Sequence, residues 1–137
     1  MTETLCQRLF PRHVLDGIFP PERCDRFFDA LLGDAAEGAY DIVLNCSDIT
    51  DERLVFDFEL KQRPGRCLAC NLTYGLPEVF QRHPIIDVAG VVRQIDARLT
   101  NGRRCGEWSL GRTREISRSL HVVPLTVRLV ADTEPPV

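Results

Sequence analysis

The sequence predicts an α+β domain, a two-layer sandwich in which two amphipathic helices cover one face of an antiparallel sheet. Three observations lead to this prediction. Residues 20–33 show the apolar spacing of a helix with one buried stripe, residues 40–61 alternate like a half-buried hairpin, and residues 84–99 return to helical spacing. Further strand-like segments complete the predicted element order α-β-β-β-α-β-β.

The length of 137 residues suits one domain, which we place at residues 20–130. Residues 1–19 are expected to form an N-terminal arm or short helix, because Pro11 and Gly17 interrupt their apolar residues. Residues 131–137 are expected to be a disordered tail. No apolar run reaches the roughly 20 residues that a membrane span needs.

The N-terminal segment also bears on location. The stretch MTETLCQRLFPRHV mixes acidic and basic residues and has no long apolar core, so it does not resemble a secretion signal. We therefore expect a cytoplasmic protein without membrane contact. In that compartment its six cysteines are expected to be free thiols rather than a disulfide framework.

The first helix is expected to begin at Pro20-Pro21, because a proline in the first turn removes an N–H that has no partner there. Gly33 or Gly38 is expected to end it. Its buried stripe follows the spacing i, i+3, i+4, i+7 and i+8: Cys24, Phe27, Phe28, Leu31 and Leu32.

A hairpin is expected next, with strands at 40–46 and 54–61 joined by the turn segment SDITDE. One face of the hairpin carries the apolar residues: Tyr40, Ile42, Leu44, Cys46, Leu54, Phe56, Phe58 and Leu60. We expect Phe56 and Phe58 to be among the most buried residues and to pack under the helix that carries Phe27 and Phe28.

The stretch PGRCLACNLTYG, residues 64–75, contains Cys67 and Cys70 at a spacing typical of zinc knuckles and thiol redox pairs. Its apolar alternation favours a third strand, in which residues i and i+3 point to opposite faces. We therefore expect Cys70 to be buried, Cys67 to point away and no metal to be bound. A redox pair is disfavoured, because no helix follows to lower the thiol pKa. The alternative zinc site would use four ligands: Cys67, Cys70, His83 and Cys105.

Pro84 is expected to begin the second helix, which Asn101-Gly102 would cap. Its stripe is formed by apolar residues at helical spacing: Val88, Val91, Val92, Ile95 and Leu99. Close packing against the sheet would explain Gly90 within it. Two strands follow, near 106–112 and 119–130. Pro124 cannot donate to a ladder, so the last strand is expected to lie at an edge or to bend there.

No pattern in the chain is typical of catalysis. His13, His83 and His121 lie far apart and belong to no recognisable nucleophile motif. Asp57 and Glu59 project from the polar face of the hairpin, where they are expected to keep that face solvated. We therefore expect no catalytic residues and no cofactor, and favour a binding protein over an enzyme.

Charge is distributed unevenly along the chain: residues 1–60 carry 13 acids and 5 bases, whereas residues 61–128 carry 12 bases and 5 acids. Nearly every base is arginine, whose planar guanidinium suits carboxylates and phosphates. If the turns that carry the arginines meet, they form a rim that binds anions or nucleic acid: Arg63, Arg66, Arg103, Arg104, Arg112, Arg114 and Arg118. This is the second choice of function, because the chain as a whole is acidic and offers no aromatic stacking platform.

The last strand, SLHVVPLTVRLV, is apolar on both faces, and an edge strand of this kind is usually covered or paired. We expect Leu120 and Val122 to lie in a homodimer interface. The acidic and basic halves of the chain could also meet across such an interface. The preferred function is a non-enzymatic binding or adaptor protein that acts through protein–protein contacts.

The predicted element order resembles that of the small acidic dimeric chaperones of bacterial secretion systems. The resemblance concerns the order of helices and strands and no sequence motif. It implies a bacterial binding module that works as a dimer. The chain departs from that pattern at its end, where the family has a further helix and this chain has Pro135-Pro136.

Overall fold

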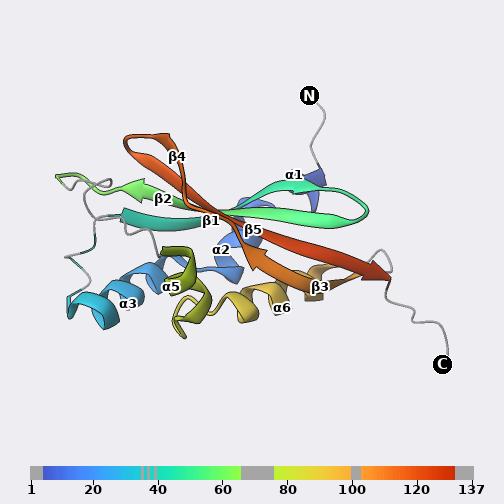
Figure 1. Ribbon diagram of the computed structural model, residues 1–137, viewed down its shortest axis with the longest axis horizontal. Helices are drawn as coiled ribbons and strands as arrows, with labels where there is room; N and C mark the ends of the chain where they lie inside the picture. The colour runs from blue at the N-terminus through green and yellow to red at the C-terminus, as the bar shows by residue number, and fades with distance from the viewer. Residues whose placement is uncertain are drawn as a thin grey trace.

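The computed structural model describes residues 5–34, 36, 38, 40–65, 76–99 and 103–131. A five-stranded antiparallel sheet forms one layer, and α2, α3, α5 and α6 lie on one of its faces (Figure 1). The predicted α+β class is therefore confirmed. Within the described ranges, no helix is long and apolar enough to cross a membrane.

The elements follow the chain in this order. The helices are α1 (Leu5–Leu9), α2 (Arg12–Ile18), α3 (Pro21–Leu32), α5 (Leu76–Arg82) and α6 (Val88–Arg98). The strands are β1 (Tyr40–Ile49), β2 (Arg53–Gln62), β3 (Arg103–Leu110), β4 (Arg114–Ser117) and β5 (Leu120–Ala131). The third strand predicted around Cys67 and Cys70 lies outside the described residues.

The sheet has the order β1-β2-β5-β3, and β4 also pairs with β5. β4 pairs with residues 120–122 of β5 and β3 with residues 125–131, so β3 and β4 form one interrupted edge strand. The interruption lies beside Pro124, whose carbonyl accepts a hydrogen bond from the Gly111 N–H at 2.8 Å. In an antiparallel sheet, a residue directs its N–H and C=O to the same neighbouring strand. Pro124 has no N–H, so it can only accept a hydrogen bond from the strand formed by β3 and β4.

The expected edge position of the last strand is therefore wrong. β5 lies between β2 on one side and β3 with β4 on the other. A proline is tolerated in this central strand because the neighbouring strand, rather than β5, is broken at that level.

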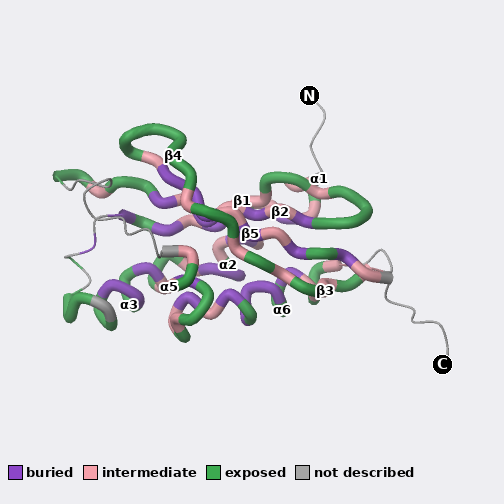
Figure 2. Tube along the Cα trace, viewed as in Figure 1, coloured by how far each residue is buried: buried purple, intermediate pink, exposed green. Residues whose placement is uncertain are grey.

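The core lies between the sheet and the helices (Figure 2). Phe56 and Phe58 are fully buried, as predicted. The Phe58 ring packs against Phe19 at 5.5 Å and Phe80 at 5.7 Å, and the Phe56 ring against Phe10 at 5.0 Å. These ring partners come from the N-terminal segment and α5, whereas the prediction named Phe27 and Phe28 of α3.

The prediction for α3 is largely confirmed. The helix has a proline in its first turn and ends at Gly33, whose φ of 83° is the left-handed conformation that glycine favours. Cys24, Phe27 and Phe28 are buried, but Leu32 is 51% exposed, so the buried stripe is narrower than predicted.

Two helix boundaries differ from the sequence analysis. Residues 76–82, where no helix was predicted, form α5, in which Phe80 is fully buried. α6 begins at Val88 instead of Pro84, since the Asp87 side chain accepts from the Gly90 N–H at 3.1 Å. A Cβ at residue 90 would collide with that carboxylate, so the cap, and not packing against the sheet, explains Gly90.

The expectation that all six cysteines are thiols is also wrong. Cys6 of α1 and Cys46 of β1 form a disulfide with a Cα–Cα distance of 5.6 Å. The two cysteines meet because α1 lies against β1. They are 40 positions apart in the sequence, so their spacing does not predict the disulfide. Cys24 and Cys105 are free thiols.

Candidate functional site

The first candidate surface is the face of the sheet opposite the helices, here called the open face. The strand registers place a mixture of apolar, acidic and basic side chains on it. Its members are Asp41, Val43, Asn45, Arg53, Val55, Asp57, Glu59, Lys61, Arg114, Leu120, Val122, Pro124, Thr126 and Arg128. Val122 is only 4% exposed, whereas Val43, Val55, Leu120 and Pro124 are half-buried. An antiparallel sheet with one solvated face normally shows polar residues there, so this apolar content is unusual.

A chain of polar contacts crosses the open face from the β1 side. The Arg12 guanidinium donates to Asn45 Oδ1 at 2.7 Å, and the Asn45 amide donates to the Glu59 carboxylate. Lys61 Nζ lies 3.8 Å from the same carboxylate. The side chains of Asn45 and Glu59 are thus held in place by Arg12 on the β1 side and by Lys61 on β2 itself.

Asp57 lies beside Glu59 on β2, opposite Asn45 on one side and Pro124 on the other. Partial burial raises the pKa of the Asp57 carboxyl, the charge of Glu59 raises it further, and Arg114 opposes both. Two neighbouring carboxylates of this kind form a negative patch that a cation from outside would stabilise.

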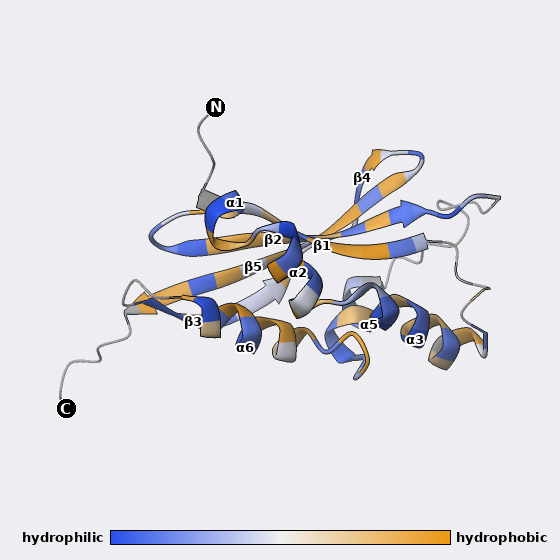
Figure 3. Cartoon of the chain, turned by 180° about the vertical axis from the view of Figure 1, so that it is seen from behind, coloured by the Kyte–Doolittle hydropathy of each residue, from blue (hydrophilic) through white to orange (hydrophobic). Residues whose placement is uncertain are grey.

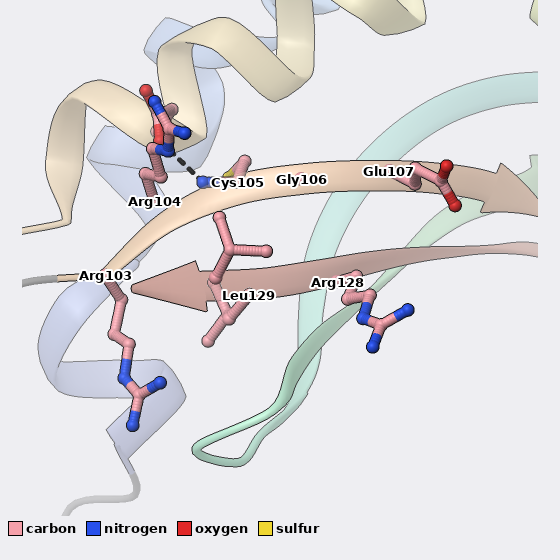
Figure 4. Close-up of a pocket in the computed structure, with 9 residues that line it drawn as sticks. Arg103, Arg104, Cys105, Gly106, Glu107, Arg128 and Leu129 are labelled. Carbon is pink, nitrogen blue, oxygen red and sulfur yellow. Dashed lines mark hydrogen bonds between the residues drawn. The ribbon is translucent and has the colours of Figure 1, made fainter. Parts of the chain in front are cut away.

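The second candidate is an open pocket of about 750 Å³ between the start of β3 and the end of β5 (Figure 4). Its lining contains three arginines, two carboxylates and a thiol, and consists of Asp96, Arg103, Arg104, Cys105, Gly106, Glu107, Arg128, Leu129 and Val130. Arg128 and Asp96 were not among the predicted site residues. A charged residue within the apolar run of the last strand was the available signal for Arg128.

Cys105 in this pocket is not a reactive thiol. Burial, together with the nearby Asp96 carboxylate, raises its pKa to about 12. Asp96 Oδ1 also accepts from the Cys105 backbone N–H at 2.7 Å, which fixes the strand at this point (Figure 4). Since the thiolate is the nucleophile, a thiol that stays protonated at neutral pH is a poor nucleophile.

The predicted arginine residues fall into separate places. Arg104 pairs with Val130 and Arg114 with Val122, eight positions apart along β5, or about 27 Å at 3.4 Å per residue. Arg103 and Arg104 therefore lie at one end of β5, and the exposed group around β4 lies at the other: Arg112, Arg114 and Arg118. The described arginines do not form one continuous rim.

Arg63 belongs to neither group. Its guanidinium makes ion pairs with Asp25 at 2.9 Å and Asp41 at 3.0 Å and lies over the Phe28 ring. These contacts join α3 to the end of the hairpin, so the charge of Arg63 is matched within the chain. Arg66 lies outside the described residues.

Of the four residues considered for zinc, Cys67 and Cys70 lie outside the described residues. The His83 ring packs 4.8 Å from Phe27, and its Nδ1 accepts from the Ile85 N–H at 3.2 Å. Among the residues that the structure describes, no group of three or more His, Cys, Asp or Glu side chains could hold a metal ion.

The predicted interface residues, Leu120 and Val122, both belong to the open face. Val122 is already covered within the chain, because its neighbours in the register are Glu59 on β2 and Arg114 on β4. No family model, curated protein or solved structure matches the chain.

Proposed function

We propose that this protein is a non-enzymatic binding or adaptor protein that works as a homodimer through the open face of its sheet. One observation carries the proposal: this face combines half-buried apolar side chains with acidic and basic residues that lie on different halves of it. Both features are typical of surfaces that bind another protein.

The apolar part of the argument rests on Val43, Val55, Leu120 and Pro124, which are half-buried on a face without helices. Together they run across three neighbouring strands. A second copy of the sheet would remove their remaining surface from water, which stabilises an interface in proportion to the apolar area buried.

The charges support a second copy as the occupant. The acidic residues lie on β1 and in the middle of β2: Asp41, Asp57 and Glu59. The basic residues of the other half lie on β4 and β5: Arg114 and Arg128. A two-fold axis that runs along the strands, between β2 and β5, brings the acidic half of each protomer over the basic half of the other. The bases of β2, Arg53 and Lys61, stand at its two ends, away from the middle of the face.

Light scattering tests this proposal. We expect a dimer with about 800 Å² buried per protomer, whose dissociation constant rises with salt because the charges are screened. Val55→Glu should give a folded monomer, since it replaces an apolar side chain of the interface by a carboxylate that would lose its hydration there. Leu32→Glu, at an exposed leucine at the end of α3, is the matched control and should remain dimeric. A wild-type monomer at high micromolar concentration would disprove the proposal.

Charge reversal tests the orientation of the two protomers. Asp57→Lys and Arg114→Asp should each weaken the dimer, because each places like charges across the interface. An equimolar mixture of the two variants should form heterodimers, in which both reversed charges again face their opposites. If the mixture stays as monomeric as the separate variants, the two halves do not face each other.

The cytoplasmic location belongs to the same proposal. A reducing cytoplasm keeps most cysteines as thiols, so the Cys6–Cys46 pair reports on location. Alkylation of the thiols in intact cells, followed by mass spectrometry, should find both residues modified. A protected pair would place the protein in an oxidising compartment instead.

A further inference from the structure

The two edges of the sheet differ in how they are covered. At the β1 edge, the Arg12 guanidinium donates to the Leu44 carbonyl at 2.6 Å, and the disulfide between Cys6 and Cys46 holds α1 against the strand. Figure 3 shows α1 and α2 in front of β1. Covering an edge in this way prevents another strand from pairing with it.

At the opposite edge, none of the described residues covers β4 in this way. All four residues of β4 are exposed, and within the described part of the chain β4 pairs with β5 alone. In Figure 1 the β4–β5 hairpin projects from the side of the sheet away from the helices. Ile116 in this strand is 54% exposed, although it is a large apolar residue. An uncovered edge presents unpaired N–H and C=O groups, to which an extended segment can bind.

The charges around β4 indicate which kind of segment fits. Arg112, Arg114 and Arg118 are all exposed and stand within seven residues, against one acidic residue, Glu115. Among the described residues, none of the three arginines makes an ion pair within 4.0 Å, although Arg114 acts at longer range on Asp57. Arginine binds carboxylates with two parallel hydrogen bonds, so this edge suits a negatively charged partner.

We infer that the β4 edge binds an extended, acidic peptide segment of another protein, which adds to the sheet as a further strand. Backbone hydrogen bonds to β4 would supply affinity, and side chains would supply selectivity. Carboxylates of the segment would pair with Arg112, Arg114 and Arg118, and an apolar side chain would cover Ile116. A second copy of β4 is disfavoured, because it would bring the same arginines against each other.

This site shares Arg114 with the open face, but its backbone edge does not depend on the proposed homodimer. Peptide binding can therefore be measured on the wild type and on Val55→Glu alike. If the homodimer proposal fails, both proteins are monomers and the peptide should still bind. If the peptide does not bind, the mass of the wild-type protein is unaffected.

The experiment uses a fluorescein-labelled synthetic peptide of eight residues in which Glu and Val alternate. Two matched peptides serve as controls: one has Lys in place of Glu, and the other keeps Glu but is N-methylated at alternate backbone amides. We expect saturable binding of the Glu peptide by fluorescence anisotropy and at least about tenfold weaker binding of both controls. N-methylation removes donors of the added strand without changing its charge, so equal binding of that control would disprove strand addition.

Protein variants and mapping locate the site. Arg112→Glu combined with Arg118→Glu should abolish binding, whereas Arg93→Glu combined with Arg98→Glu, at exposed arginines of α6, should leave it unchanged. Amide chemical shifts recorded with the wild-type protein need no variant and should move within residues 112–118. Shifts confined to the pocket around Arg103 and Arg128 would overturn the assignment. Tighter binding of a single-stranded oligonucleotide than of the Glu peptide would also overturn it, in favour of nucleic acid.

Discussion

The β1 edge and the β4 edge of the same antiparallel sheet differ in length, with ten residues in β1 and four in β4, and they are stabilised differently. β1 receives a disulfide, an arginine and two helices from the first 18 residues of the chain. β4 follows the break beside Pro124, carries a register shift between Glu115 and Ser117, and pairs only with β5 among the described residues. Edge protection therefore depends on segments from elsewhere in the chain, and among the described residues no such segment covers β4.

The difference also predicts a gradient of local stability. A tight turn joins β1 to β2, with the Thr50 N–H donating to the Arg53 carbonyl at 2.9 Å. β4 has few buried contacts, and its residues are exposed throughout. Regions with few buried contacts open first in hydrogen exchange, so amides of β4 should exchange before those of β1.

The largest expected loss of stability is at β2 in the centre of the sheet, and the effects at both edges are compared with it. Phe58→Ala on β2 should lower the free energy of unfolding by about 3–5 kcal/mol, because it leaves a cavity between Phe19 and Phe80. Urea denaturation measures the change. Val55→Ala, on the open face of the same strand, is the control and should cost about 1 kcal/mol. A similar loss for both variants would show that the two faces are equally packed.

Of the interactions at the β1 edge, the disulfide is expected to contribute most to stability. Cys6→Ser should lower the free energy of unfolding by about 2–4 kcal/mol, since the bond closes a loop between residues 40 positions apart. Reductant should destabilise the wild type by a similar amount and leave the variant unaffected. The control Cys105→Ser keeps the disulfide and should still respond to reductant. If reductant does not change the stability of the wild type, the disulfide does not stabilise this edge.

The contact of Arg12 with β1 should have a smaller effect. Arg12→Ala removes hydrogen bonds to the Leu44 carbonyl and to Asn45 and should cost about 1 kcal/mol. Hydrogen exchange should also accelerate along β1. Arg8→Ala, at an exposed arginine of α1, is the control and should change neither quantity. Equal effects of the two variants would mean that Arg12 contributes only charge.

The smallest effect is expected at the β4 edge. Ile116→Thr should change the free energy of unfolding by less than about 0.5 kcal/mol, because the side chain is already 54% exposed. Ile42→Thr on β1, where isoleucine is 2% exposed, should cost more than about 2 kcal/mol by burying a hydroxyl. Thermal unfolding compares the two. A large loss at Ile116 would show that β4 is part of the stable core and not a free edge.

Local patterns in the sequence determined the helices α3 and α6, the β1–β2 hairpin and the buried face of each. Apolar spacing reports which side of an element is buried, and residues such as Phe58 and Val91 follow it. α5 was not predicted, because a single buried aromatic residue, Phe80, does not produce a periodic pattern in the sequence. Of the candidate sites, the sequence identified the arginines and the two open-face residues Leu120 and Val122, but not where they would lie.

Only the tertiary structure decided which segments meet. The central position of β5, the disulfide from α1 to β1 and the separation of the arginines into two groups all depend on pairing between distant residues. Pro124 illustrates the limit: its missing N–H requires an interruption, but the sequence does not say whether the strand itself or its neighbour gives way. Periodicity is a property of one segment, whereas register and edge protection are properties of two, which is why the sequence predicted the layers and the fold decided the surfaces.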